Sequence, residues 1–174
     1  PIHYSGVYES QIIKNVCDTL IDYNKDLSEY VPSLATDWTV SDDGMTYVFN
    51  IRQGVKFQKG QYQDGREMTA EDVAYSLNRS GELSDSNRLS MLDKAEATGD
   101  YEVTCTLKSA NSSFLTALTD AGNAIVPKEE VEGWGDDFGS HLVGTGPFSL
   151  ESFQLDQQAV LKKNADYWLA EPNL

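Results

Sequence analysis

The chain has 174 residues, of which 40% are hydrophobic and 10% aromatic, a composition typical of a globular protein that can bury a core as one domain. Asp and Glu number 28 against 13 Lys and Arg, so the formal net charge is −15. A surface this acidic repels phosphate backbones and anionic lipid headgroups, which argues against binding to nucleic acid or to a membrane surface. The acidic residues are scattered, which favours a solvated surface over a dedicated site for cationic ligands.

The first predicted helix covers about residues 8–20 and follows a short segment, residues 4–8, with the sequence Tyr-Ser-Gly-Val-Tyr. Ser5 is placed to cap this helix, and the first N–H groups of a helix have no acceptor within it, so they can face outward. Gly6 has no Cβ and therefore permits another chain to approach closely. Residues 4–8 are the candidate binding segment, with an ordinary frayed terminus as the alternative.

A β-hairpin is predicted around the turn signal Asp43-Gly44. One strand begins at Trp38, and the other covers residues 47–51, where Tyr47, Phe49 and Ile51 alternate with polar or exposed positions. This alternation is typical of a strand with one buried face.

A capped helix is predicted to follow a second turn at Asp64-Gly65. Thr69 and Asp72 have the spacing of a capping box, which predicts a helix from Ala70 to about Asn78. Its apolar face recurs with the helical period, at Ala70, Val73, Ala74 and Leu77.

The second half of the chain mixes short helices and strands. Residues 80–90 are polar and rich in turn formers, which predicts a mobile connection. The later predicted elements are a strand at 101–108, a helix at 114–118 capped by Ser112 or Ser113, a strand at 124–127, a helix at 128–134, and a hairpin of 148–153 and 159–162 around Asp156. Because strands and helices do not alternate regularly, the predicted fold class is α+β or mixed α/β.

The two cysteines occupy predicted apolar faces. Cys17 lies on the apolar stripe of the first predicted helix, and Cys105 shares one face of the 101–108 strand with Val103 and Leu107. Both positions are typical of small buried hydrophobic side chains. A disulfide between them is the alternative, since the sequence does not supply the geometry that such a bond requires.

No residue pattern indicates catalysis, a metal site or a bound cofactor. His3 and His141 have no partner at metal-ligand spacing, and no nucleophile motif occurs. Gly144-Thr145-Gly146 does not continue as a dinucleotide fingerprint, because Pro147 follows. We expect a tight backbone turn there or, alternatively, a close approach of the backbone to a ligand or to a facing lobe.

Four segments occur in an order and at spacings that suggest a family. They are residues 31–38 (Val-Pro-Ser-Leu-Ala-Thr-Asp-Trp), 41–77, 143–148 (Val-Gly-Thr-Gly-Pro-Phe) and 161–168 (Leu-Lys-Lys-Asn-Ala-Asp-Tyr-Trp). Together they resemble the family 5 extracellular solute-binding proteins, the oligopeptide and dipeptide receptors of bacterial ABC importers. Trp38 and Trp168 lie inside these elements, and we expect both to pack in the core.

The resemblance implies part of the first lobe of a periplasmic-binding-protein-like fold (type II, cluster C), which has two lobes. Members of the family are much longer than this chain. We therefore expect residues 1–174 to form a single domain, and the second lobe to be absent from the chain.

The resemblance also implies a function, which is binding rather than catalysis. The family captures peptides outside the cytoplasmic membrane, in the periplasm or on a lipid anchor, and delivers them to ABC permease subunits. A hinged two-lobe clamp closes on the ligand. Ser5, Gly6 and Val7 align with an extended segment that lines the cleft and pairs with peptide backbone. Gly144, Thr145 and Gly146 are possible cleft or hinge backbone.

Two alternatives stay open. The same family also has members that bind a nickel chelate, haem, a sugar or an opine. Similar domains also occur as ligand-sensing modules of transcriptional regulators, in which a fused domain makes the DNA contacts.

Overall fold

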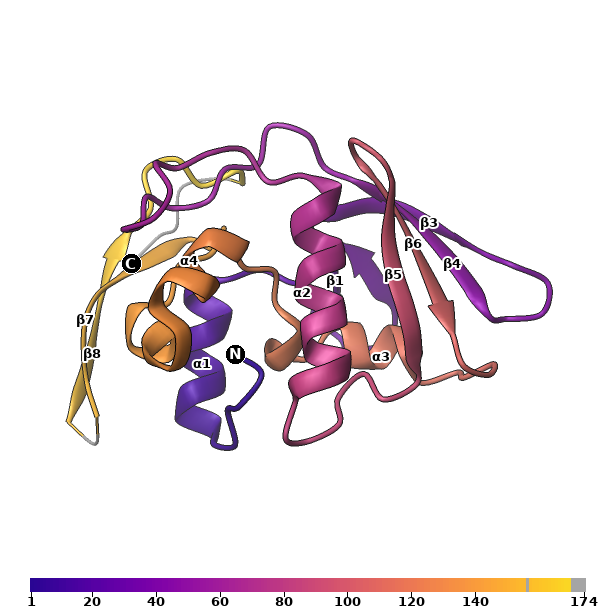
Figure 1. Ribbon diagram of the computed structural model, residues 1–174, viewed down its shortest axis with the longest axis horizontal. Coiled ribbons are helices and arrows are strands. Elements are labelled where there is room, and N and C mark those ends of the chain that lie inside the picture. Colours follow the sequence, from indigo (N-terminus) through magenta and orange to yellow (C-terminus); the bar gives the residue numbers. More distant parts are fainter. Residues whose placement is uncertain (156, 170–174) are drawn as a thin grey trace.

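A computed structural model describes residues 1–155 and 157–169 and contains a four-stranded antiparallel sheet at one end (Figure 1). The strands lie in the order β3 (Ala35–Val40), β4 (Thr46–Ile51), β6 (Glu102–Leu107) and β5 (Leu92–Gly99). α2 (Ala70–Leu83) packs against the sheet, mainly over β5. The short helix α3 (Phe114–Leu118) follows the sheet and contacts β1 (Ile21–Tyr23), which pairs with β2 (Tyr30–Pro32).

The other end of the molecule holds α1 (Val7–Val16), α4 (Lys128–Trp134) and the hairpin of β7 (Phe148–Gln154) and β8 (Gln158–Lys163) (Figure 1). Two 3-10 helices join this group. η1 (Ala121–Asn123) contacts α1 and α2, and η2 (Gly135–His141) contacts α4 and β7. In Figure 1, α2 stands between this group and the sheet.

Buried side chains form two apolar clusters. The larger cluster joins the sheet to α2 and α3, and its largest fully buried members include Phe49, Leu77 and Phe114. The smaller cluster joins α1 to η1, α4 and η2 through residues such as Val16, Val131 and Phe138. Burial of these apolar side chains is the main favourable term that holds each group of elements together.

The predicted fold class is confirmed, as are most of the predicted elements. Gly44 and Gly65 adopt positive φ angles of 68° and 70° in the two predicted turns. The Asp72 carboxylate accepts a hydrogen bond from the Thr69 backbone N–H at 3.0 Å, as a capping box requires. The helices at 114–118 and 128–134 and the closing hairpin are also present. Asp156, the predicted centre of that hairpin, lies outside the described residues.

Two predicted helix ends were wrong. α1 ends at Val16 rather than near residue 20, because Cys17 turns to extended geometry (φ −127°, ψ 150°) where the chain meets residues 144–146. α2 continues to Leu83 through a stretch predicted to be a mobile connection. Ser80 and Ser84 suit this buried stretch because their hydroxyls find acceptors in Asn123 and the Ile2 carbonyl.

One strand was missed, and one predicted strand was wrong. β5 was not anticipated, because its two buried residues, Leu92 and Ala95, are three positions apart and charges at Asp93, Lys94 and Glu96 hide any alternation. Its outer edge is closed in part by Asn78, whose side-chain amide donates to the Ala95 carbonyl and accepts from the Ala95 N–H, both at 2.8 Å. Residues 124–127 are buried and extended but pair with no strand among the described residues.

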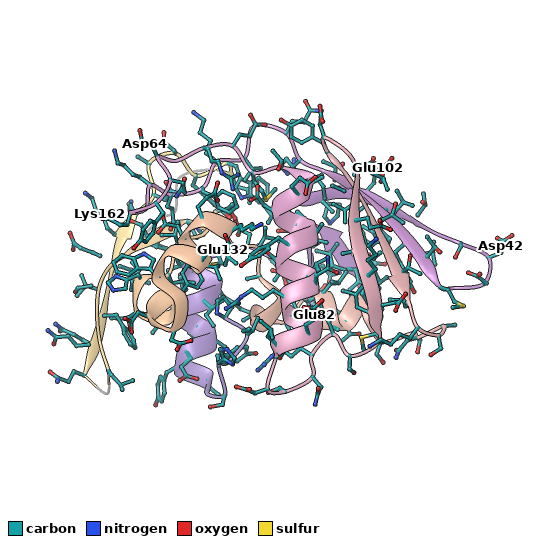
Figure 2. The ribbon with its side chains drawn as sticks, viewed as in Figure 1. Asp42, Asp64, Glu82, Glu102, Glu132 and Lys162 are labelled. Carbon is teal, nitrogen blue, oxygen red and sulfur yellow. The ribbon has the colours of Figure 1, made fainter. Side chains whose placement is uncertain are left out.

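Cys17 and Cys105 are free thiols in different clusters, so the alternative of a disulfide between them was wrong. Burial raises the pKa of both thiols to about 12. The exposed acidic residues Asp42, Asp64, Glu82 and Glu132 lie far from one another (Figure 2), which agrees with a dispersed negative surface. Within residues 1–155 and 157–169, no helix has the length and apolarity to cross a membrane.

Candidate functional site

The candidate binding segment Ser5–Val7 lies at the start of α1, on the surface. Gly6 is the N-cap residue, so the prediction that Ser5 caps the helix was wrong by one position. The Glu9 carboxylate accepts hydrogen bonds from the backbone N–H groups of Ser5 and Gly6, both at 2.8 Å, and these bonds lower the pKa of Glu9. Val7 is 70% exposed, so the helix start faces solvent.

Arg88 holds the segment that leads to this helix start. Its guanidinium donates to the Tyr4 carbonyl at 2.7 Å and to the Ile2 carbonyl at 3.2 Å, and it lies over the Tyr4 ring at 4.1 Å. It also pairs with Asp120 at 2.9 Å, and Asp120 accepts a hydrogen bond from the Tyr4 hydroxyl at 3.0 Å. Sequence reasoning missed Arg88, because it lies within the polar stretch 80–90, whose pattern gave no sign of burial.

Gly144, Thr145 and Gly146 are buried against the C-terminal end of α1. A Cβ added to Gly144 would lie 2.5 Å from the Val16 carbonyl oxygen, and one added to Gly146 would lie 2.6 Å from the Val16 carbonyl carbon. The Gly146 N–H donates to the Val16 carbonyl at 2.9 Å. Glycine is therefore needed here for contact with the chain's own helix. That this backbone also borders a ligand cleft or acts as a hinge stays a prediction.

The side chain of Gln58 fills the remaining gap at this end of α1. Its amide nitrogen lies 3.0 Å from the Val16 carbonyl oxygen, 3.1 Å from that of Gly146 and 2.8 Å from that of Phe148. Its amide oxygen accepts from the Gly144 N–H at 3.3 Å, and its backbone N–H donates to the Gly144 carbonyl at 2.9 Å. One buried side chain thus provides partners for backbone groups of α1, residues 144–146 and β7.

Asp18 draws a third segment to the same place. Its carboxylate accepts hydrogen bonds from the Thr145 hydroxyl and from Nε1 of Trp168, both at 2.9 Å, and from the Tyr167 hydroxyl at 3.5 Å. Burial raises the pKa of Asp18, outweighing these three hydrogen bonds, which lower it. The carboxylate is therefore held in place by its donors at a desolvation cost.

Arg52 connects Trp168 to the remaining motif. Its guanidinium lies 4.6 Å from the centroid of the Trp168 ring, and its Nε donates to the Ser33 carbonyl at 3.1 Å. Trp38 and Trp168 both pack against the larger apolar cluster, so the expectation of core packing is confirmed. Residues 31–38, 143–148 and 161–168 are therefore parts of one scaffold junction around the end of α1.

Both histidines have partners away from this junction. His141 stacks on Trp134 with ring centroids 3.5 Å apart, and His3 pairs with Asp85 at the surface. Across the described part of the chain, no three His, Cys, Asp or Glu side chains are grouped closely enough to hold a metal ion. The arrangement offers a presented backbone segment on a rigid support, which suits binding.

The chain is similar in sequence to known solute-binding proteins. Residues 29–174 match the family described as bacterial extracellular solute-binding proteins, family 5 Middle. The glutathione-binding protein GsiB of Salmonella typhi is 33% identical over 172 residues, covering 97% of this chain and 32% of that protein. GsiB of Escherichia coli O1:K1 / APEC is 35% identical over 139 residues, covering 78% of this chain and 26% of that protein. The chain thus spans about a third of the length of these relatives.

Solved structures with the same fold include proteins with different ligands. The periplasmic binding protein DppA from Helicobacter pylori, in complex with peptide STSA, has a TM-score of 0.86 and 27% identity over 98% of this chain and 38% of that chain. A dipeptide binding protein from Pseudoalteromonas sp. SM9913, in complex with Met-Leu, has a TM-score of 0.83 and 28% identity over 98% and 38%. MoaA of A. tumefaciens R10, in complex with mannopinic acid, has a TM-score of 0.86 and 28% identity over 97% and 35%.

Gly146→Ala is expected to destabilise the protein by about 3 kcal/mol, because the new methyl group would overlap backbone atoms of Val16 that have little freedom to move. Gly139→Ala is the matched control, since no atom lies within 4 Å of its added Cβ. Urea unfolding of the two variants measures the difference. Equal free energies of unfolding would show that residues 144–146 do not depend on close contact with α1.

Asp18→Asn is expected to change stability in a pH-dependent way. Because the folded pKa of Asp18 lies above its unfolded value of 3.8, its favourable contribution is present below about pH 3.8 and is lost as pH rises through the folded pKa. The amide avoids this loss, so the variant should gain stability relative to the native protein between pH 3.5 and 7. Asp18→Ala should lose about 1–3 kcal/mol at the acidic end of this range, because Trp168 and Thr145 lose their acceptor, and less as pH rises, because it too lacks the titrating carboxyl. Urea unfolding across this range tests both; a pH-independent difference for Asp18→Asn would contradict the account.

Proposed function

Because the chain belongs to the bacterial extracellular solute-binding proteins of family 5, we propose that it forms part of the first lobe of the substrate-binding component of an ABC importer. In this role the protein captures peptides outside the cytoplasmic membrane and delivers them to permease subunits. It acts by binding and not by catalysis. We further propose that the second lobe belongs to the part of the relatives' length that these 174 residues do not span.

The observation that carries the proposal is the exposed start of α1 at Ser5, Gly6 and Val7, where the N–H groups of Ser5 and Gly6 already donate to Glu9 and the Val7 N–H is the donor offered to a ligand. Arg88 fixes the residues before this segment, and Gln58 fixes the far end of the helix that follows it. The N–H of Val7 belongs to the first turn of α1, where no acceptor is available within the helix. A peptide lying along this segment can accept a hydrogen bond from the Val7 N–H, which provides affinity without requiring one particular ligand sequence.

A hinged clamp is the mechanism that we propose for the whole protein. Ligand bound to the first lobe also contacts the second, so that the closed state has more ligand contacts than the open state and becomes the more populated one. The hydrogen bonds of Arg88 before α1 and of Gln58 at the end of α1 hold this helix in place within the first lobe while the lobes move. The proposed location is extracytoplasmic, either in the periplasm or on a lipid anchor at the outer face of the cytoplasmic membrane.

A peptide is the ligand class that we favour. Two of the similar structures are described in complex with a peptide and with Met-Leu, and the similar curated proteins are described as glutathione-binding. An opine is the second candidate, because a structure of equal similarity is described in complex with mannopinic acid. Mass spectrometry of the ligand that co-purifies with a polypeptide of the relatives' full length distinguishes the two.

Val7→Pro tests the contribution of the presented backbone. Proline is favoured at the first position of a helix, and the extended Gly6 (φ −111°, ψ 157°) is compatible with a following proline, so α1 should be retained. The substitution removes the Val7 N–H, and we expect peptide affinity to fall roughly tenfold, the effect of losing one hydrogen bond. Calorimetry on a polypeptide of the relatives' full length measures this effect.

Val7→Ala is the matched control, because it also removes the valine side chain but keeps the N–H. Circular dichroism verifies that both variants retain α1. Equal peptide affinities of the two variants would show that the Val7 N–H does not contact the ligand.

A further inference from the structure

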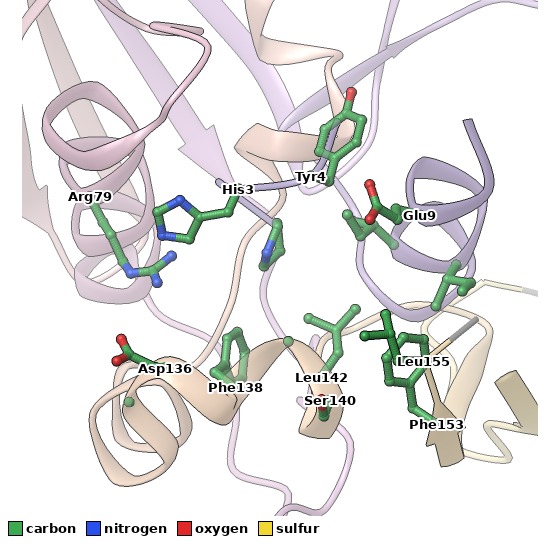
Figure 3. Close-up of a pocket in the computed structure, with 15 residues that line it drawn as sticks. His3, Tyr4, Glu9, Arg79, Asp136, Phe138, Ser140, Leu142, Phe153 and Leu155 are labelled. Carbon is green, nitrogen blue, oxygen red and sulfur yellow. The ribbon is translucent and has the colours of Figure 1, made fainter. Parts of the chain in front are cut away.

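A pocket separate from Ser5–Val7 lies between α1, α2, η2 and β7 (Figure 3). Its volume is about 410 Å³, within the roughly 300–1,000 Å³ range of small-molecule sites. One end carries charged side chains, with Arg79 from α2 and Asp136 from η2. The opposite end carries the apolar side chains of Leu142, Phe153 and Leu155, and Figure 3 shows Glu9 and Ser140 on the same side. The pocket is therefore amphipathic along its length.

Arg79 differs from the other three arginines in having neither a paired carboxylate nor an aromatic ring beneath its guanidinium among the described residues. Arg66 pairs with Asp72 at 2.6 Å and with Glu129 at 2.7 Å, and Arg88 pairs with Asp120 at 2.9 Å. Arg52 lies over the ring of Trp168 at 4.6 Å. Among the residues that the structure describes, no carboxylate lies within ion-pair distance of the Arg79 guanidinium.

The pKa values of two of these arginines are shifted in opposite directions. Hydrogen bonds that Arg66 donates to Asp72 and Glu129 raise its pKa, whereas burial lowers the pKa of Arg79. A partly buried cation without a paired anion is unfavourable, and a bound carboxylate would remove that cost. The planar guanidinium fork also matches the two oxygens of a carboxylate.

The acidic residues that line the pocket do not fill this role. The Glu9 carboxylate is held by the N–H groups of Ser5 and Gly6 at the start of α1. Asp136 is exposed in the first turn of η2 and forms no ion pair with Arg79. His3, which lies beside Arg79 in Figure 3, pairs with Asp85. The guanidinium is thus available to an anion that enters the pocket.

We propose that this pocket binds a carboxylate joined to an apolar group, with Arg79 pairing with the carboxylate and the side chains of Leu142, Phe153 and Leu155 contacting the apolar part. The carboxylate has two possible sources, a free small-molecule acid or an acidic side chain of a polypeptide segment. Both present the same chemistry to Arg79. The proposal does not depend on the function assigned to Ser5–Val7, because none of those three residues lines the pocket.

Titration of the 174-residue protein with hexanoate tests the proposal, and the amide NMR signals of Gly135 and Gly139 in the pocket wall report binding. We expect a dissociation constant on the order of 1 mM for so small a ligand. Hexan-1-ol and hexylammonium should shift these signals much less, because they lack the carboxylate.

Two peptide probes test the other source of the carboxylate. Acetyl-Phe-Glu-amide carries a side-chain carboxylate, and acetyl-Phe-Gln-amide carries an amide in its place. Tighter binding of the Glu peptide than of hexanoate assigns the site to a polypeptide carboxylate, and the reverse order assigns it to a free acid.

Arg79→Gln should weaken binding of the carboxylate probes at least tenfold, and Arg79→Lys should weaken it less, because it keeps the charge but loses the fork. Asp136→Asn should strengthen binding by removing a negative charge from the same end of the pocket. Lys14→Gln is the control, since it removes one exposed positive charge of α1 outside the pocket. Near-UV circular dichroism verifies the fold of each variant. The proposal is overturned if neither hexanoate nor the Glu peptide shifts the two glycine signals, or if Arg79→Gln binds them as the native protein does.

Discussion

The amide of Gln58 holds together three parts of the chain that are far apart in sequence. It is 6% exposed and lies within hydrogen-bond distance of backbone groups from Val16, Gly144, Gly146 and Phe148. The Val16 and Gly146 carbonyls also accept from the Gly146 N–H and the Asn164 side chain, so Gln58 adds to their hydrogen bonding, and removing a buried partner from such groups is costly. These hydrogen bonds therefore fix the relative positions of the end of α1, the turn before β7 and the loop that carries Gln58.

The hydrogen bonds around Gln58 explain why the residues of the recognisable motifs support the fold at the end of α1. Gly144 and Gly146 have no Cβ because the end of α1 lies where a Cβ would be. Trp168 and Thr145 share the Asp18 carboxylate, one residue beyond the C-cap of α1. With its C-terminal end fixed in this way, α1 presents its opposite end, with Ser5–Val7, to the surface. The recognisable residues thus support the proposed binding segment from a distance.

Much of the fold was predictable because local rules decide it. The turns at Gly44 and Gly65, the capping box of α2 and the alternation of β6 each depend on a few neighbouring residues. The end of α1, the length of α2 and the existence of β5 depend instead on partners distant in sequence. The same holds at the candidate site, where the position of residues 5–7 could be anticipated but not their support by Arg88. The lack of an ion pair at Arg79 within the described part of the chain likewise arises only when α2 and η2 come together.

The stability of Gln58→Met, compared with that of Gln53→Met, is the most direct measure of this account. Gln53 is exposed in the same loop, so its replacement should change the free energy of unfolding by less than about 0.5 kcal/mol. Methionine at position 58 fills a similar volume but satisfies none of the four backbone groups, so a loss of about 3 kcal/mol or more is expected. Similar free energies of unfolding for the two variants would contradict the claim that Gln58 holds the end of α1 in place.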